Sequence, residues 1–247
     1  MSSIGFYVPS YKRAGKVITS RWIKSAILCV HQSEEKEYEE KEKNKLLILP
    51  DNLKGNMAKV RNFILDNSVH DVTCMLDDDI SSIGYYETDN IEEKMEFNCI
   101  TEGDLFYKVN EWREQAEDLG TILFGINLQS DPKFYREYSP LSLQSPVLGT
   151  FCCILKTDLR YDERLGLNED YDFALQVLRK HKKILRWGKY SYKANHLTMP
   201  GGCGAYRVLD EEKRQAEIMV KKWGSKIVRY DFKKSTNPRI RSPYKGI

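Results

Sequence analysis

The chain contains no apolar run long enough to cross a bilayer, and its N-terminus lacks the basic segment and long apolar stretch of a signal peptide. Its six cysteines are scattered, and none forms a Cys-x-x-Cys pair matched by a second pair, as a zinc site would require. Three of them, Cys74, Cys152 and Cys153, lie in apolar runs, where a thiol acts as a small hydrophobic group. These absences predict a cytoplasmic protein in a reducing compartment, with no disulfide framework and no membrane partner.

The chain also lacks a large excess of either charge, because its net charge is only +3. The charge is unevenly distributed, however. From Lys221 to the end there are nine Lys and Arg against one acid, Asp231, so this segment carries +8 and the rest about −5. A basic tail on an acidic body suggests a polyanionic partner such as DNA, although a solvated tail is the alternative.

Apolar spacing predicts a single α/β domain. We expect strands at 4–8, 46–49, 72–76, 121–126, 147–155 and 184–187, and helices at 17–30, 55–67, 105–119, 169–180 and 210–223. The highly charged stretch at 33–45 is expected to be an exposed helix end and loop. Strands and helices alternate in the first half, which favours a mostly parallel central sheet covered on both faces. The boundaries predicted are 1–208 for a catalytic α/β domain and 209–247 for a C-terminal helix and basic extension.

The strongest chemical signal is the segment Cys74–Asp79, with the sequence CMLDDD. Three carboxylates at the end of an apolar strand are costly to hold together unless a cation offsets their repulsion. In an open α/β sheet, ligands bind beyond the carboxyl ends of the strands. Alternation along an extended segment would place Asp77 and Asp79 on the same side, facing one ion, for which oxygen ligands favour Mg²⁺ or Mn²⁺. A solvated acidic turn is the alternative.

A second acidic group lies at Gly166–Asp172, with the sequence GLNEDYD. Asn168 is a suitable N-cap, and acids in a first helical turn suit the helix dipole. That dipole would keep Asp170 ionised, as a general base must be. Helix capping alone also explains the pattern, so a chemical role for Glu169 and Asp170 depends on the aspartate triplet.

The third signal is His196, which precedes the glycine-rich segment containing Gly201 and Gly202. Backbone amides can approach phosphate in such a loop, and a neutral imidazole can bind a divalent ion. A loop histidine bonded to the backbone is the alternative. The glycines are not a phosphate-loop NTPase motif, because no Gly-Lys-Ser/Thr follows.

The fourth group combines basic and aromatic residues near the first strand and the helix expected from residue 55. It consists of Pro9, Tyr11, Arg13, Asn56, Lys59, Arg61 and Asn62. A base stacked on Tyr11, with phosphates near Arg13 or Arg61, would be ordinary nucleotide recognition. Each cation taken singly is also compatible with a solvated surface.

Together, these segments resemble the glycosyltransferase A fold over residues 4–207. The resemblance rests on a VPSYKR first strand end, a GNMAKVRN helix, an Asp-x-Asp strand end and a Glu-Asp pair before a helix. It implies that Asp77 and Asp78 lie near the nucleotide and that Asp79, with Asp77 and His196, binds the metal. Asp170, beside Glu169, is implied as the base of an inverting enzyme. The compact size and the PSYKR opening also resemble the viral and phage branch called TET-associated glycosyltransferases.

The resemblance implies transfer of a sugar from a nucleotide diphosphate donor, most simply uridine diphosphate glucose, with Mn²⁺ or Mg²⁺. The viral branch implies a hydroxymethylated pyrimidine in DNA as the acceptor, gripped by the basic tail. One alternative acceptor is a cell-surface or capsid glycan, stacked on Trp187, Tyr190 and Tyr192. A non-catalytic nucleic-acid-binding protein would explain the tail but not the ordered acids. A nucleotidyltransferase would be expected to carry a glycine-rich loop near its first strand, where only Gly15 occurs.

Overall fold

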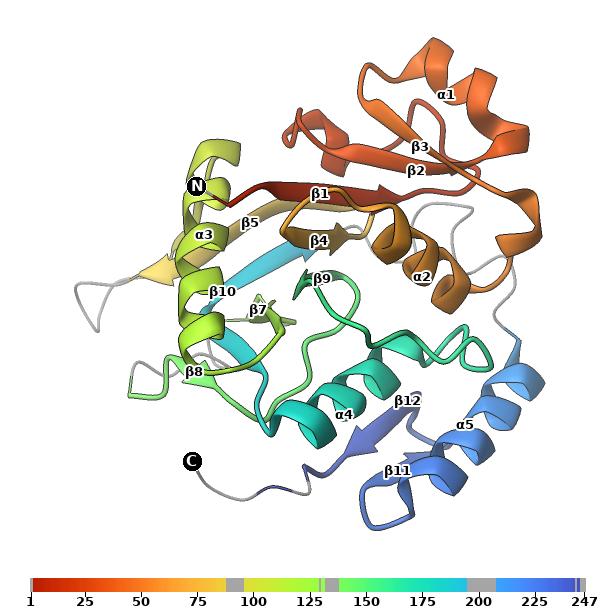
Figure 1. The fold of residues 1–247 in the computed structure, drawn as a ribbon, viewed down its shortest axis with the longest axis vertical. Coiled ribbons are helices and arrows are strands. Elements are labelled where there is room, and N and C mark those ends of the chain that lie inside the picture. The colour runs from red at the N-terminus through yellow and green to blue at the C-terminus, as the bar shows by residue number, and fades with distance from the viewer. Residues whose placement is uncertain are drawn as a thin grey trace.

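The computed structural model describes residues 2–87, 96–128, 130–131, 138–194, 208–242 and 244. Its centre is a ten-stranded sheet (Figure 1) in the order β3-β2-β1-β4-β9-β7-β10-β5-β6, with β8 paired to β10. The strands are β1 Ile4–Pro9, β2 Ile27–His31, β3 Lys45–Leu49, β4 Val72–Leu76, β5 Ile80–Glu87, β6 Glu96–Cys99, β7 Leu123–Asn127, β8 Leu141–Ser142, β9 Phe151–Leu155 and β10 Leu185–Ala194. Only β9, β5 and β8 run against the others, so the expected α/β fold with a mostly parallel sheet is confirmed.

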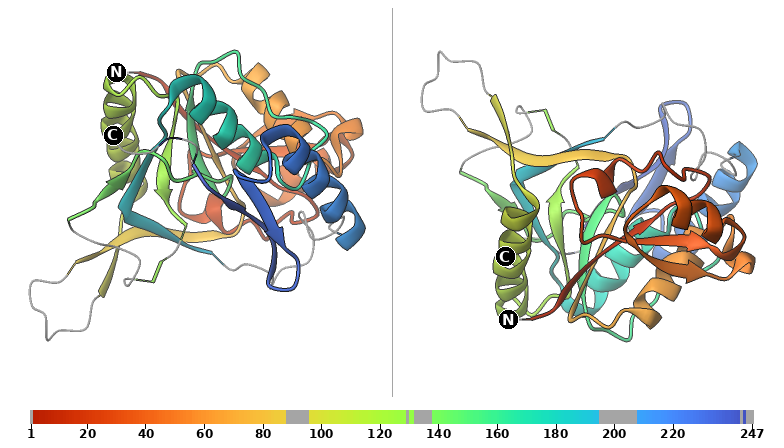
Figure 2. Two further views of the ribbon diagram at one scale, coloured as in Figure 1. Left: turned by 90° about the horizontal axis from the view of Figure 1, so that it is seen from below. Right: turned by 90° about the horizontal axis from the view of Figure 1, so that it is seen from above.

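Helices cover both faces of the sheet, as the two views in Figure 2 show. They are α1 Glu35–Lys41, α2 Met57–Asn67, α3 Glu102–Asp118, α4 Glu169–His181 and α5 Leu209–Trp223. On one face, α3 inserts Leu105, Val109 and Trp112 into a core cluster with the even-numbered residues of β1 and β4. On the other face, α2 and α4 share a second cluster with Tyr7 and Met75. The sheet is therefore buried on both sides, as its continuous apolar strands require.

One predicted helix is wrong. The segment at 17–30 contains a short 3-10 helix, Thr19–Arg21 (η1), and then strand β2. Its apolar residues have helical spacing, but Ile27–His31 is also a short continuous apolar run, which is ambiguous between helix and strand. Hydrogen bonding to β1 on one side and β3 on the other makes this run a strand.

The other predicted elements are present with shifted ends, and β4 matches its predicted range of 72–76. The charged stretch forms a helix of its own, α1, in which Tyr38 is the buried residue. Two further 3-10 turns, Gln32–Glu34 (η2) and Asp51–Leu53 (η3), precede α1 and α2. The late strand extends to Ala194, and β5 and β6 were not predicted.

The C-terminal segment folds onto the domain. After α5, strands β11 Val228–Asp231 and β12 Ser235–Ile240 form an antiparallel hairpin. Met219 of α5 and Val228 of β11 are fully buried in the second core cluster. Most of the predicted basic tail is therefore an ordered part of the fold.

The five described cysteines are free thiols, and Cys203 lies outside the described ranges. Across these residues, no helix combines the length and apolar character that a membrane span needs.

Candidate active site

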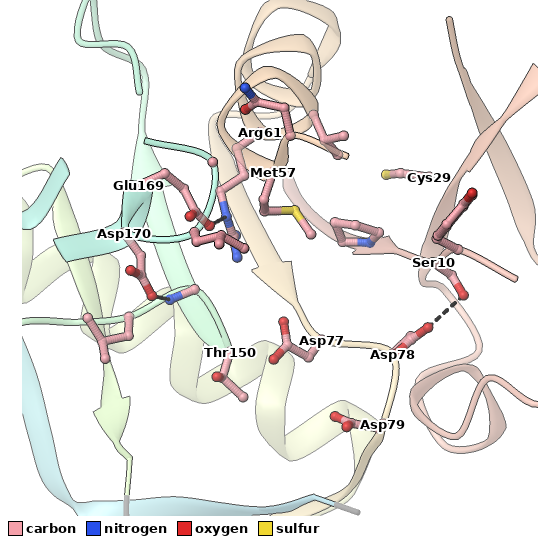
Figure 3. Close-up of a pocket in the computed structure, with 18 of the residues that line it drawn as sticks. Ser10, Cys29, Met57, Arg61, Asp77, Asp78, Asp79, Thr150, Glu169 and Asp170 are labelled. Carbon is pink, nitrogen blue, oxygen red and sulfur yellow. Dashed lines mark hydrogen bonds and ion pairs between the residues drawn. The ribbon is translucent and has the colours of Figure 1, made fainter. Parts of the chain in front are cut away.

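A cavity of 640 Å³ opens at the carboxyl ends of β1, β2, β3 and β4. The first turns of α2 and α4 and the loop at 148–150 form its other walls. Figure 3 shows acids from two directions facing this space, Asp77 from the end of β4 and Asp170 from the start of α4. This is the edge at which open α/β sheets bind ligands.

The three aspartates lie in the turn between β4 and β5, and all of them line the cavity. Because Asp77, Asp78 and Asp79 form a turn, strand alternation does not set their directions as the sequence argument assumed. Two contacts fix the turn. The Thr19 hydroxyl donates to the Asp77 carbonyl at 2.6 Å, and the Asp77 N–H donates to the Thr150 carbonyl at 3.1 Å.

Asp78 is buried, and Figure 3 shows its carboxylate pointing to Ser10. It accepts a hydrogen bond from the Ser10 hydroxyl at 2.7 Å and forms an ion pair with Arg13. Because Ser10 donates its proton to Asp78, it accepts one from the Tyr38 hydroxyl, 2.8 Å away. Burial raises the pKa of Asp78 to about 6, against the opposing effects of Ser10 and Arg13. Asp78 therefore anchors the acidic turn to β1 and α1.

Asp77 and Asp79 are the other two acids of this turn. No group of three or more His, Cys, Asp or Glu able to hold a metal ion occurs among the residues that the structure describes. His196, Gly201 and Gly202 lie outside those residues. Two carboxylates fit a hard divalent ion that takes its remaining ligands from phosphate and water.

Glu169 and Arg61 form a buried ion pair between α4 and α2. Arg61 Nε lies 3.1 Å from Glu169 Oε1, and the side chains of Arg61 and Glu169 are only 5% and 7% exposed, respectively. Gly149 packs directly on this pair, because a Cβ there would lie 2.0 Å from Arg61 Nη2. Burial, followed by the charge of Asp170, raises the pKa of Glu169 to about 8, while Arg61 opposes the shift. Both side chains thus hold two helices together, although both also line the cavity.

Asp170 is partly exposed at the cavity wall. Its Oδ2 accepts from the Gly149 N–H at 3.2 Å and its Oδ1 from the Tyr171 N–H at 2.7 Å. Asn168 occupies the N-cap position of α4, but its side chain makes no capping bond and instead accepts from the Tyr230 hydroxyl at 3.2 Å. Two backbone N–H donors therefore hold the Asp170 carboxylate at the start of α4.

The nucleotide-binding residues predicted from the sequence are mostly brought together. Seven of them line the cavity: Pro9, Tyr11, Arg13, Asn56, Arg61, Asp77 and Asp78. The Tyr11 ring packs edge-on against His31, with centroids 5.6 Å apart. Asn56 caps α2 by accepting from the Lys59 backbone N–H at 3.1 Å, but Lys59 is not among the described lining residues. A donor contact for Lys59 stays a prediction.

Sequence reasoning missed several lining residues. They are Ser10, Cys29, His31, Leu148, Gly149, Thr150 and Asn237. Ser10 lies inside the VPSYKR segment, so its position beside the aspartates could have been found from that motif. Gly149 and Thr150 reach the acidic turn only through the pairing of β4 with β9, which no local pattern reveals.

A family model described as TET-Associated Glycosyltransferase matches residues 4–202. The chain belongs to this family. Among the curated proteins, none matches this glycosyltransferase. The non-catalytic and nucleotidyltransferase alternatives are therefore set aside.

Solved structures agree on the fold. Glucosyl-3-phosphoglycerate synthase from Mycobacterium tuberculosis, with Mn²⁺, uridine diphosphate glucose and glycerol 3-phosphate, is 9% identical at a TM-score of 0.54, covering 98% of this chain and 87% of that one. The same enzyme with Mg²⁺ and uridine diphosphate is 9% identical at 0.51, covering 90% and 80%. Residues 1–349 of TarS from Staphylococcus aureus are 11% identical and cover 91% of this chain and 73% of that one, at a TM-score of 0.47 that is too low to bear on the fold. The fold is that of the glycosyltransferase A enzymes.

Proposed function

We propose that this glycosyltransferase moves a hexose, most simply glucose, from a uridine diphosphate sugar to a hydroxymethylated pyrimidine in DNA, with inversion at the anomeric carbon. One observation carries the proposal. A single cavity places the acidic turn and the residues expected to bind the nucleotide opposite Asp170, a carboxylate held at the surface by backbone donors. Donor and acceptor would meet between them.

The donor side is supported by the first strand end and by the structural neighbours. Tyr11 and His31 offer ring surfaces for a uracil base beside Pro9. Arg13 pairs with Asp78 and lines the cavity, so its positive charge would lie near the diphosphate. Uridine diphosphate glucose is bound by the mycobacterial synthase, which shares this fold.

A divalent ion, Mn²⁺ or Mg²⁺, fits the donor side. Asp79 and Asp77 would hold it, with His196 as the further protein ligand expected from the family resemblance. The ion would supply positive charge to the leaving diphosphate. Carboxylate oxygens are the ligands that both ions prefer, and both ions occur in complexes of the mycobacterial synthase.

Asp170 would act as the general base. The acceptor hydroxyl oxygen forms the new bond to the anomeric carbon, and its proton passes to an Asp170 carboxylate oxygen. The bond from the anomeric carbon to the diphosphate breaks, and the diphosphate leaves with the electron pair. Glu169 is the poorer base, because it is buried and engaged by Arg61, so we assign it to positioning the first turn of α4.

The acceptor assignment rests on the family's description as TET-associated and on the basic C-terminal segment. A base inside a duplex would have to be flipped out to reach Asp170. The glycan alternative gains little from the structure. Of its three proposed stacking residues only Tyr192 lines the cavity, whereas Trp187 and Tyr190 pack against the first core cluster.

The proposal is tested by incubating the protein with uridine diphosphate glucose, Mn²⁺ and duplex DNA that carries 5-hydroxymethylcytosine or 5-hydroxymethyluracil. Mass spectrometry of the digested DNA should show a hexose on the modified pyrimidine. Matched DNA with unmodified or 5-methylated bases is the control, because it lacks the attacking hydroxyl. Donor hydrolysis without transfer to either DNA would reject DNA as the acceptor while retaining the donor assignment.

A further inference from the structure

The C-terminal hairpin lies beyond the residues that the family model matches, yet one of its residues lines the active-site cavity. Asn237, in β12, borders the same space as Asp170 and Tyr171, and its side chain is exposed. The hydrogen bond from Tyr230 of β11 to Asn168 ties the hairpin to the start of α4. The hairpin is thus held beside the helix that presents Asp170.

Burial alternates along β12 and separates its two faces. Pro238 is buried and Ile240 packs on the second core cluster, whereas Asn237, Arg239 and Arg241 are exposed. Successive side chains of a strand point to opposite faces, so these three exposed residues form one row with a spacing of about 6.6 Å. The row begins at the cavity and leads away from it along the strand.

Cations gather at the far end of this row. Arg229 of β11 is the cross-strand partner of Arg239, so its side chain stands on the same face. A second cavity of 230 Å³ lies there, bordered by Lys226, Ile227, Arg229, Arg239, Ile240 and Arg241. The ion pair between Arg239 and Asp231 spans 3.8 Å between largely exposed groups, which leaves it weak in water.

We propose that this exposed face of the hairpin binds the acceptor DNA strand, and we call it the acceptor track. This proposal rests on the DNA acceptor proposed above. Asn237 contacts the target pyrimidine at the cavity, and Arg229, Arg239 and Arg241 bind phosphates of the same strand. The asparagine amide both donates and accepts, as the hydrogen-bonding edge of a flipped pyrimidine requires. The guanidinium forks match phosphate oxygens.

A strand of nucleic acid fits the row better than a free anion does. An isolated phosphate could occupy the basic cavity, but it would not explain why the row of exposed residues connects that cavity to Asn237 and Asp170. A nucleic-acid strand could place a base in the active-site cavity and its phosphates beside the arginines, so it would contact both ends of the row. The track also differs from a solvated tail, because Pro238 and Val228 fix the hairpin to the core.

The phosphate contacts are tested with the double variant R239Q/R241Q. Its matched control is K36Q/K43Q, which removes the same charge from two exposed lysines in and just after α1. Affinity for a fluorescent duplex with 5-hydroxymethylcytosine is measured by anisotropy between 50 and about 200 mM salt. Loss of two phosphate contacts should lower the slope of log affinity against log salt by about 1.8. The control should keep the wild-type slope.

The base contact is tested with N237A, matched to T236A at the neighbouring, half-buried position. N237A should raise KM for the DNA roughly 3- to 10-fold, the loss of one neutral hydrogen bond or slightly more, while KM for the donor and the salt slope stay at wild-type values. T236A should leave all three values unchanged. Melting curves confirm that each variant is folded.

The outcomes separate this inference from the proposed function. If wild type transfers glucose to the DNA but R239Q/R241Q and K36Q/K43Q give equal slopes, the phosphate track is overturned while the enzyme assignment stands. An unchanged KM for DNA in N237A overturns the base contact. If wild type hydrolyses the donor and transfers nothing to any DNA, the acceptor assignment fails and the track fails with it.

Discussion

Replacing Asp170 with asparagine tests the mechanism most directly. The carboxylate accepts two backbone hydrogen bonds, from Gly149 and Tyr171, and an asparagine can satisfy only one of them with its single oxygen. The variant loses one of these bonds and places its side-chain NH₂ against a backbone N–H. Together these changes should lower the free energy of unfolding by about 1–3 kcal/mol. The fold and the donor side of the cavity should remain intact, because neither acid of the metal site is touched.

Turnover should fall much further than stability. A positioned general base contributes roughly two to four powers of ten, so kcat of D170N should drop by that factor. The assay is glucose transfer to hydroxymethylated duplex at saturating donor, with donor affinity measured separately by calorimetry in Mn²⁺. Unchanged donor affinity with lost turnover supports the base. Turnover within about fivefold of wild type would refute it.

Glu169 provides the neighbouring control. E169Q retains the shape of the side chain and an oxygen that can accept from Arg61 Nε. Because burial already raises the pKa of Glu169 to about 8, an uncharged side chain here should cost little stability at neutral pH. Assayed well below its melting temperature, E169Q should keep far more activity than D170N. The reverse order would exchange the roles of the two acids. The anomeric configuration of the product, read by NMR, must also be inverted, because a base in this position cannot explain retention.

Three further variants probe the acidic turn and its supports. D79A should abolish the effect of Mn²⁺ on donor affinity, and calorimetry with and without the ion would contradict the metal site if D79A and wild type responded equally. G149A places a methyl group 2.0 Å from a guanidinium nitrogen and should cost about 1–3 kcal/mol in urea unfolding, whereas G103A, whose nearest neighbour is 3.8 Å away, should be neutral or better. S10A removes a hydrogen bond that lowers the pKa of Asp78. That pKa is already raised in the folded state, to about 6, so this group's contribution to stability declines as pH rises from the usual range of aspartate through about 6. In S10A the decline should be larger and extend above pH 6; unfolding free energies with the same pH profile as wild type would count against the account.

The order of the elements and the positions of the acidic groups could be predicted from the sequence, because both follow from local patterns. β4 is fully buried and ends directly at the aspartates, so an apolar run followed by acids identified both the strand and the site. α4 has a comparable signature in its capping residue and acidic first turn. The helix predicted at 17–30 is wrong for a physical reason. Its spacing suits either structure, and the choice depends on hydrogen bonds to strands distant in the sequence.

The roles of individual charges could not be read from the chain. Arg61 and Glu169 are 108 residues apart, and nothing local indicates that they neutralise each other inside the protein. Asp78 likewise turns to Ser10 and Arg13 because the turn is pinned to β1. In each case the side chain type was recognised, but its partner comes from the tertiary fold.

The charges lining the cavity favour the cation proposed for the donor side. Among the lining residues that the structure describes, five are acids and two are arginines, and each arginine pairs with one of those acids. Asp77, Asp79 and Asp170 are the other three of these acids, and a nucleotide diphosphate would bring further negative charge beside them. Like charges within a few ångströms destabilise one another strongly where water is partly excluded. The two arginine pairs position α2, α4 and the acidic turn, so they cannot be released to receive the diphosphate without loosening the walls. A divalent ion held by the turn would relieve this repulsion on the donor side, while Asp170 on the opposite wall would face the acceptor.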